Sequence, residues 1–334
     1  MDSAMTEQEI REKIQSHTHF APPAKLKMVT DTSEFMSIQA GDILELEGRL
    51  YLVRGEEMEG RFGLDGEPKF WVKKAIDLEN GQPKVIKLVF HETFLMRLGE
   101  YDIRCLRSPT KESRILDKVR HHPHFMQGFT IPDHVGNPVR VIDKIQGARF
   151  YDFIHGIDMG HEQYFHDLFP SVFTNVVMCI SAINDLHNLG DVHGDIRNDH
   201  IFIERGTKTY KWIDFDYMYE WAENPYGVDL FGLGNILMFT IGKGFHNVPE
   251  LKKNQALYSD ILASLTADDV SLFFSHRIIN LRKLFPYIPQ DLNQVLMHFS
   301  QGAEVFYETT SELLEDLQAC GYYVDGQMAA GSGT

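Results

Sequence analysis

The sequence predicts an α+β fold in which strands come first and helices follow. Between residues 43 and 89, four β-rich runs (ILELEG, RLYLV, KFWVKKAI and KVIKLVF) are separated by glycine, proline and acidic turn residues. Asn80-Gly81, between two of these runs, is a strong signal for a hairpin turn. The second half of the chain instead carries apolar residues at helical spacing. This order indicates one part dominated by a sheet and a second part dominated by helices.

The helices of the second half are marked by their apolar periodicity and by their ends. Apolar residues recur at helical spacing between positions 173 and 186, and Gly190 follows where a left-handed cap is expected. A very apolar helix covers residues 229–240, and the last helix begins with the capping box Thr309-x-x-Glu312. We further expect a helix at 112–119, a strand at 139–145 and a small hairpin formed by residues 201–203 and 211–213.

These patterns divide the chain into four segments. We expect an N-terminal extension (1–40), a sheet-rich lobe with one helix (41–145), a helical lobe (146–324) and a disordered polar tail (325–334). The extension begins with a short amphipathic helix at residues 7–14, which Pro22-Pro23 would end.

The composition excludes several classes of partner. The formal net charge is −16, whereas a protein that binds nucleic acid through its phosphates needs an excess of Lys and Arg. No apolar run reaches the length of a membrane span, and the first thirty residues show no signal-peptide pattern. The three cysteines (Cys105, Cys179 and Cys320) show neither a disulfide framework nor zinc spacing. We therefore expect a soluble, cytoplasmic protein without a nucleic-acid or membrane partner.

The segment VHGDIRNDHI, residues 192–201, is the most informative for chemistry. It lies between the long helix and the small hairpin, and Asp214 in the run IDFD follows Asp195 by nineteen residues. Phosphoryl transfer needs one carboxylate that orients the acceptor hydroxyl and another that holds the metal bridging the nucleotide phosphates. An acid on a loop, followed by a hairpin and a second acid, delivers two such carboxylates to one cleft.

These motifs resemble those of the protein-kinase superfamily, in the same order and over residues 45–320. His193-Gly194-Asp195 is similar to the variant found in aminoglycoside phosphotransferases, choline kinases and some atypical protein kinases. The resemblance implies a two-lobed protein-kinase-like fold, with Asp195 as the catalytic base, Arg197 as a phosphate contact and Asp214 as the main metal ligand.

The resemblance extends into the sheet-rich lobe. Lys87 in VIKL corresponds to the strand lysine that contacts the α- and β-phosphates, and Glu112 to the helix residue that pairs with it. Lys73 and Lys74 compete for the first role, but they lie on the preceding strand.

The resemblance also implies how adenine and the catalytic loop are held. The segment IDKI, residues 142–145, resembles the hinge, so the backbone of Asp143 and Ile145 would bind adenine. The glycine-rich loop corresponds to MEGRFG, residues 58–63, in which Gly60 and Gly63 are kept and methionine replaces the first glycine. Asp229 would brace the catalytic loop from its helix, although it also suits a simple helix cap.

Three departures from the kinase pattern concern the metal and the acceptor. His200 stands where a metal-binding Asn is usual, which favours Mn²⁺ over Mg²⁺, and Asp199 or Asp216 would supply the missing oxygen. Gly194 replaces an Arg that would pair with a phosphorylated activation loop. Only fifteen residues separate Asp214 from Asp229 and no Ala-Pro-Glu occurs, which weakens the case for a peptide acceptor.

Three functions remain open at this point. The first is an ATP-dependent kinase that uses Mg²⁺ or Mn²⁺ and phosphorylates an unidentified hydroxyl acceptor, either a protein Ser/Thr or a small molecule. The second is a pseudokinase that senses nucleotide or acts as a scaffold, and the third is transfer of a nucleotidyl group. The histidines His121, His122 and His124 invite a separate metal site, but exposed polar residues on a connecting turn are the more frequent explanation.

Overall fold

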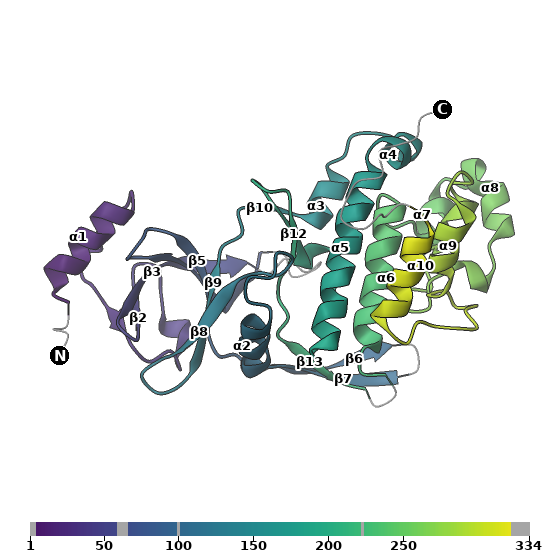
Figure 1. Cartoon of the computed structure of the whole chain (residues 1–334). Helices are drawn as coiled ribbons and strands as arrows, with labels where there is room; N and C mark the ends of the chain where they lie inside the picture. Colours follow the sequence, from purple (N-terminus) through teal and green to yellow (C-terminus); the bar gives the residue numbers. More distant parts are fainter. Residues whose placement is uncertain (1–4, 59–65, 99–100, 222–223, 322–334) are drawn as a thin grey trace. The chain divides into compact units, whose positions relative to one another are not determined.

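The computed structural model describes residues 5–58, 66–98, 101–221 and 224–321 (Figure 1). The chain divides into two compact units. The first consists of Met1–Glu92, Arg107–His122 and Met126–Ile145, and the second of Thr93–Leu106, Pro123–Phe125 and Gln146–Thr334. A segment that lies between two parts of the first unit in the sequence therefore belongs to the second.

The first unit is built on a seven-stranded sheet with the order β1-β2-β3-β4-β5-β9-β8. Its strands are β1 (Met28–Val29), β2 (Ile43–Leu46), β3 (Arg49–Met58), β4 (Pro68–Asp77), β5 (Pro83–Lys87), β8 (Gly128–Pro132) and β9 (Pro138–Asp143). The four strands predicted before residue 89 are confirmed. The turn between β4 and β5 contains Gly81 at φ +73°, a left-handed conformation that glycine adopts without steric cost.

The helix α2 (Pro109–Lys118) packs against β8 and β9. It begins one turn earlier than the sequence predicted, because the Ser108 side chain accepts a hydrogen bond from the Lys111 N–H and Pro109 occupies the first turn. The first unit has a buried apolar cluster that includes Val53, Ile86 and Val141.

The helix α1 (Glu7–His17) belongs to the first unit and is not a separate extension. Ile10 and Ile14 are buried in a cluster with the strand residues Ile43, Leu50 and Leu52. The capping box at its start and its amphipathic pattern agree with the sequence. The helix ends at His17 rather than at the prolines, because Thr18 turns the chain into extended backbone.

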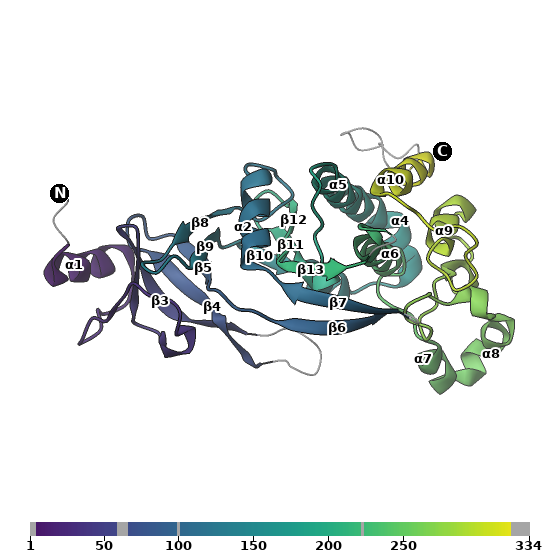
Figure 2. The same cartoon turned by 90° about the horizontal axis from the view of Figure 1, so that it is seen from below.

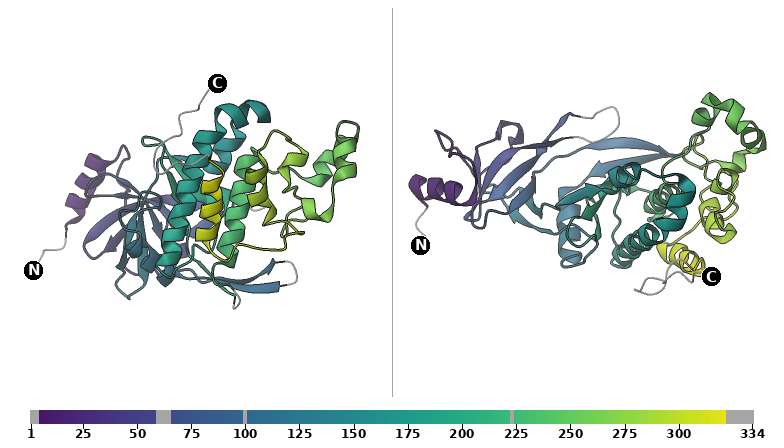
Figure 3. Two further views of the ribbon diagram at one scale, coloured as in Figure 1. Left: turned by 45° about the vertical axis from the view of Figure 1, so that its right-hand side comes forward. Right: turned by 90° about the horizontal axis from the view of Figure 1, so that it is seen from above.

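The second unit is mainly helical. Its helices are α3 (Phe150–His155), α4 (His161–Asp167), α5 (Phe169–Asn188), α6 (Gly227–Ile241), α7 (Val248–Lys253), α8 (Gln255–Ser264), α9 (Gln290–Met297) and α10 (Thr310–Ala319). The helix α5 packs against α4, α6 and α10 (Figure 3). The strands β11 (Ile201–Glu204) and β12 (Tyr210–Trp212) form the predicted hairpin, to which β10 (Gly147–Arg149) adds a third strand. The predicted α+β class is thereby confirmed.

The helix α5 corrects one expectation from the sequence. With 20 residues, it is long and apolar enough to cross a membrane by length and composition alone. The apolar side chains of this helix lie in the interior of the protein, because Phe173, Ile180 and Leu186 are completely buried. Polar residues such as Asn175 and Asn184 interrupt the apolar run of this helix, so the sequence pattern did not indicate a membrane span.

A second sheet of the second unit was not predicted. The strands β6 (Thr93–Leu98) and β7 (Tyr101–Arg107) form an antiparallel hairpin, and β13 (Tyr217–Glu220) joins it on the other edge of β7. Figure 2 shows these three strands side by side. The pair Gly99-Glu100 between the two strands is a hairpin signal of the Gly-X kind, less specific than Asn-Gly, and the sequence analysis did not use it.

Candidate active site

Residues 190–197, which the sequence resemblance implies to be the catalytic loop, follow the end of α5, and two glycines determine the course of this loop. Gly190 has φ +74° and turns the chain out of the helix. Gly194 has φ +84°, also in the left-handed region, so a glycine fits here where an arginine would be strained. The next residue, Asp195, donates its backbone N–H to Nδ1 of His193 over 3.3 Å.

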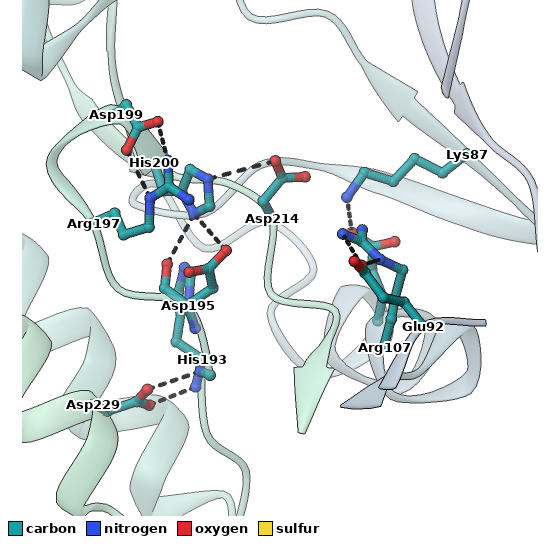
Figure 4. Close-up of polar contacts among 12 residues, drawn as sticks. Lys87, Glu92, Arg107, His193, Asp195, Arg197, Asp199, His200, Asp214 and Asp229 are labelled. Carbon is teal, nitrogen blue, oxygen red and sulfur yellow. Dashed lines mark hydrogen bonds and ion pairs between the residues drawn. The ribbon is translucent and has the colours of Figure 1, made fainter. Parts of the chain in front are cut away.

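Asp229 anchors this loop from α6. Its buried carboxylate accepts hydrogen bonds from the backbone N–H of His193 at 2.6 Å and of Gly194 at 2.8 Å (Figure 4). Burial opposes the charge of Asp229, but the hydrogen bond and the charge of His187 outweigh it, and the pKa of Asp229 is lowered from 3.8. The loop-bracing interpretation is therefore confirmed, and the N-cap position of α6 is held by Tyr226 instead.

His187 is a residue of this network that the sequence analysis missed. Its Nε2 lies 3.0 Å from the Asp229 carboxylate, and its Nδ1 lies 2.9 Å from the hydroxyl of Thr310 at the start of α10. The carboxylate can only accept, so Nε2 carries the hydrogen and Nδ1 accepts from Thr310 when the ring is neutral. The signal in the sequence was a histidine at position 187, which continues the helical spacing of the apolar residues Ile180 and Ile183.

His200 lies between the two carboxylates that the sequence singled out (Figure 4). Its Nδ1 is 2.8 Å from the backbone oxygen of Asp195 and 3.5 Å from the Oδ2 of the same residue. Its Nε2 is 3.8 Å from the Oδ2 of Asp214. A carbonyl can only accept a hydrogen bond, so Nδ1 carries the hydrogen, and Nε2 is the nitrogen directed at Asp214.

This donor set fits a divalent cation in part. Asp214 has φ +60°, an uncommon conformation that a short polar residue tolerates, and it supplies a carboxylate beside the imidazole of His200. One oxygen donor and one nitrogen donor suit Mn²⁺ better than Mg²⁺. Asp216 is almost completely buried, with 1% of its surface exposed. Within the described ranges, no group of three or more His, Cys, Asp or Glu side chains is arranged as a complete metal site.

Arg197 is held by its neighbour Asp199. The guanidinium donates from Nε to one carboxylate oxygen at 3.0 Å and from a terminal nitrogen to the other at 2.5 Å. Burial would raise the pKa of Asp199, but the charges of His200 and Arg197 outweigh it, so the pKa is lowered. Both side chains are partly exposed, so a phosphate would compete with Asp199 for this guanidinium.

The predicted lysine–glutamate pair is formed within the first unit. Lys87 on β5 donates from Nζ to Oε1 of Glu112 on α2 at 2.6 Å. Arg140 on β9, which the sequence analysis did not select, donates from Nε to the other oxygen of Glu112 at 3.1 Å. The remaining guanidinium nitrogens of Arg140 donate to the backbone oxygens of Pro138 and Leu88. The signal in the sequence was a charged residue in the middle of the apolar run VRVI.

The competing lysines have other partners in the first unit. Lys73 is fully buried and donates to the backbone oxygen of Ile38 at 2.8 Å and to Glu56 at 3.0 Å. Lys74 lies 3.6 Å from Glu57. Both are on β4, the strand before β5, as the sequence predicted.

The structure describes the hinge but not the glycine-rich loop. Asp143 ends β9, and its exposed side chain forms an ion pair with Lys84 at 2.5 Å. Its backbone N–H donates to the oxygen of Gln127, and Ile145 is the last residue of the first unit. Gly60 and Gly63 lie outside the described residues, in the segment that connects β3 and β4.

The three histidines between α2 and β8 have different surroundings. His121 is exposed, with φ +66°. His124 is buried and its Nδ1 lies 2.8 Å from the backbone oxygen of Tyr210, so it contributes to packing rather than to the surface. No metal-binding group that includes these histidines is present in the part of the chain that the structure describes.

Neither a protein-family profile nor a curated protein matches the chain. Solved structures do match, among them the crystal structure of Rad53 1-466 in complex with AMP-PNP. That match has 15% identity and a TM-score of 0.42, and it covers 74% of this chain and 60% of that chain. So distant a likeness carries no argument about the site. The protein-kinase-like fold instead stands on the strand order β3-β4-β5-β9-β8, the Lys87–Glu112 pair and the loop anchored by Asp229.

Proposed function

We propose that the protein is an ATP-dependent phosphotransferase that transfers the γ-phosphate to a hydroxyl acceptor. The observation that carries the proposal is the group in which His200 lies between the carboxylates of Asp195 and Asp214. Phosphoryl transfer is catalysed mainly by positioning and by neutralising charge, and it needs two carboxylates with separate roles.

The proposed roles follow from the contacts of each side chain. Asp195 orients the acceptor hydroxyl and accepts its proton as the oxygen attacks phosphorus. Lys87, held by Glu112, contacts the α- and β-phosphates, and Arg197 contacts the transferring phosphate once it leaves Asp199. The adenine is bound by the backbone of the hinge residues.

A divalent cation, Mg²⁺ or Mn²⁺, would neutralise the charge on the nucleotide phosphates when it is bound. Asp214 and His200 would hold it, and Asp216 is the further candidate. The Nε2 of His200 and the Oδ2 of Asp214 lie 3.8 Å apart, a separation at which both atoms could bind one ion.

The acceptor class is proposed from the segment after Asp214. Asp229 follows Asp214 by only fifteen positions, and four of the residues between them form β13, which is paired with β7. Such a short, paired segment provides little platform for an extended peptide, so we favour a small alcohol or sugar over a protein Ser/Thr.

A pseudokinase is the alternative that one observation favours. Among the described residues, no third metal ligand completes the pair formed by His200 and Asp214. A scaffold, however, has no physical need for the buried Lys87–Glu112 pair together with the braced loop of Asp195.

The first test is thermal melting with ATP plus Mg²⁺ and with ATP plus Mn²⁺, for the wild type and for Asp214→Asn. A ligand that binds only the native state raises the melting temperature by mass action. We expect a metal-dependent rise that Asp214→Asn abolishes. No rise at millimolar nucleotide would favour the scaffolding pseudokinase.

The second test concerns Asp195. Asp195→Asn should lose transfer while it keeps the stabilisation by ATP, and full activity of this variant would refute the proposed base. The intact mass of a modified acceptor distinguishes a phosphoryl group from a nucleotidyl group, which decides between the proposal and nucleotidyl transfer.

A further inference from the structure

The β6–β7 hairpin is inserted between two elements of the first unit, but it belongs to the second unit. In the sequence it lies between β5, which carries Lys87, and α2, which carries Glu112. Both of these elements belong to the first unit, yet Thr93–Leu106 belongs to the second, which also contains Asp195 and Asp214. The chain therefore leaves the first unit at Glu92 and returns to it only at Arg107.

Within the second unit, the hairpin pairs with the segment that follows Asp214. The strand β7 is the central strand of the sheet β13-β7-β6, so its backbone bonds to β13 on one side and to β6 on the other (Figure 2). Phe94 of β6 and Tyr217 of β13 add an edge-to-face ring contact at 5.3 Å. An ion pair between Arg104 and Glu220 at 3.9 Å is exposed on both sides, so it contributes little.

Two side chains of this sheet feel the charges of Asp195 and Asp229. Cys105 of β7 is buried, and burial together with the charge of Asp195 raises the pKa of its thiol. Tyr219 of β13 donates its hydroxyl to the backbone oxygen of Pro225 at 2.9 Å, and burial together with the charge of Asp229 raises its pKa. The sheet therefore lies within electrostatic range of both Asp195 and Asp229.

For the proposed transfer, the segment after Asp214 has to be held in one conformation. In switchable kinases, a phosphorylated residue and an arginine order this segment. Here Gly194 takes the place of that arginine, and its φ of +84° favours glycine. We propose that the β6–β7 hairpin is a built-in brace that holds the segment after Asp214 in its working conformation by strand pairing, without phosphorylation. The proposal rests on the proposed phosphotransferase activity for its effect on rate, but its structural effect can be measured independently.

The main test is a proline in the central strand with a matched control. Arg104→Pro removes a backbone N–H of β7 and the side chain that pairs with Glu220, whereas Arg104→Ala removes only that side chain. We expect Arg104→Pro to raise amide hydrogen exchange in residues 217–220 by at least about tenfold and to slow transfer to a similar degree. Arg104→Ala should do neither. Equal exchange and equal rates in Arg104→Pro and the wild type would overturn the proposal.

A second variant covers the case in which the proline disrupts folding. The Arg107 N–H donates to the Glu92 oxygen at 2.9 Å, and their side chains pair at 3.3 Å, so the ends of the hairpin already lie together. A short glycine-rich turn can therefore replace Thr93–Leu106. We expect this variant, which retains both Lys87 and Asp214, to keep at least part of the stabilisation by ATP and to lose protection in β13. Retained protection in β13 would contradict the brace. If ATP did not stabilise the wild type, the proposed function would be refuted. Hydrogen exchange in β13 would still test whether the hairpin holds this segment.

Discussion

Arg140 lies 3.1 Å from Glu112 and donates its Nε–H to the Oε2 of that fully buried carboxylate. The planar guanidinium of Arg140 also donates to two backbone carbonyl groups, which fix its position. It therefore links Glu112 on α2 to the sheet. Because Glu112 also holds Lys87, the lysine that would contact phosphates is positioned before any nucleotide arrives. The lysine that we propose as a phosphate contact is therefore already held in place within the first unit.

Replacing Arg140 tests this arrangement. Arg140→Met leaves a buried carboxylate with one cation fewer and two carbonyl groups without their donors, so we expect the free energy of unfolding to fall by about 2–4 kcal/mol. The stabilisation by ATP should fall as well, and Arg140→Lys should be intermediate because lysine cannot reproduce the fork. Urea unfolding and thermal shift measure the two effects.

The matched control is Arg120→Met. Arg120 pairs with Asp117 at 2.7 Å, but both side chains are more than half exposed, so the expected change is below about 0.5 kcal/mol. If the two variants lost equal stability, the buried network would not have the importance inferred for it.

Asp229→Asn should loosen the catalytic loop. Two backbone N–H groups and His187 share its carboxylate, and an amide offers only one oxygen to them, so we expect a loss of about 1–3 kcal/mol at neutral pH. The lowered pKa fixes the sign of the pH dependence, because the charged form stabilises the fold above pH 3.8 and this contribution disappears as the pH falls through the folded-state value. The difference between the variant and the wild type should therefore shrink in acid. Asp167→Asn, at an exposed position, is the control, and a difference that grows in acid would contradict the assignment.

His161 predicts a second pH effect. Its Nε2–H donates to the Ile241 oxygen at 2.8 Å, its Nδ1 accepts from the Tyr287 hydroxyl at 2.8 Å, and the ring stacks on Phe285. Burial lowers the pKa of His161 from 6.5 to about 4, so the unfolded chain takes up this proton first as the pH falls. The fold should lose up to about 1.4 kcal/mol per pH unit between these values through this residue. His161→Gln should remove that part of the slope in unfolding measured across this range, and an unchanged slope would refute the assignment.

His200→Asn tests the choice of metal. An imidazole nitrogen favours Mn²⁺, whereas an amide oxygen suits Mg²⁺, so the substitution should shift the metal dependence of ATP stabilisation towards Mg²⁺. The measurement is the melting temperature with each metal, which does not require turnover. The same ratio of Mn²⁺ to Mg²⁺ stabilisation in both proteins would show that His200 does not select the metal.

The sequence by itself determined the local parts of this protein. The first four strands, the Asn80-Gly81 turn and the capping box at Thr309 follow from side-chain alternation, turn chemistry and caps, which act between residues close in the chain. The selection of Lys87, Glu112, Asp195 and Asp214 as candidate site residues followed from motif order, which is also a property of the linear chain.

Contacts between distant segments became visible only in the folded chain. Arg140 reaches Glu112 across 28 residues, and His187 reaches Asp229 across 42, through burial that no local pattern encodes. The pairing of β7 with β13 joins segments more than a hundred residues apart, a distance over which a turn signal gives no information. Such contacts depend on which buried polar groups find partners once the core has closed, and that is a property of the whole fold rather than of any stretch of sequence.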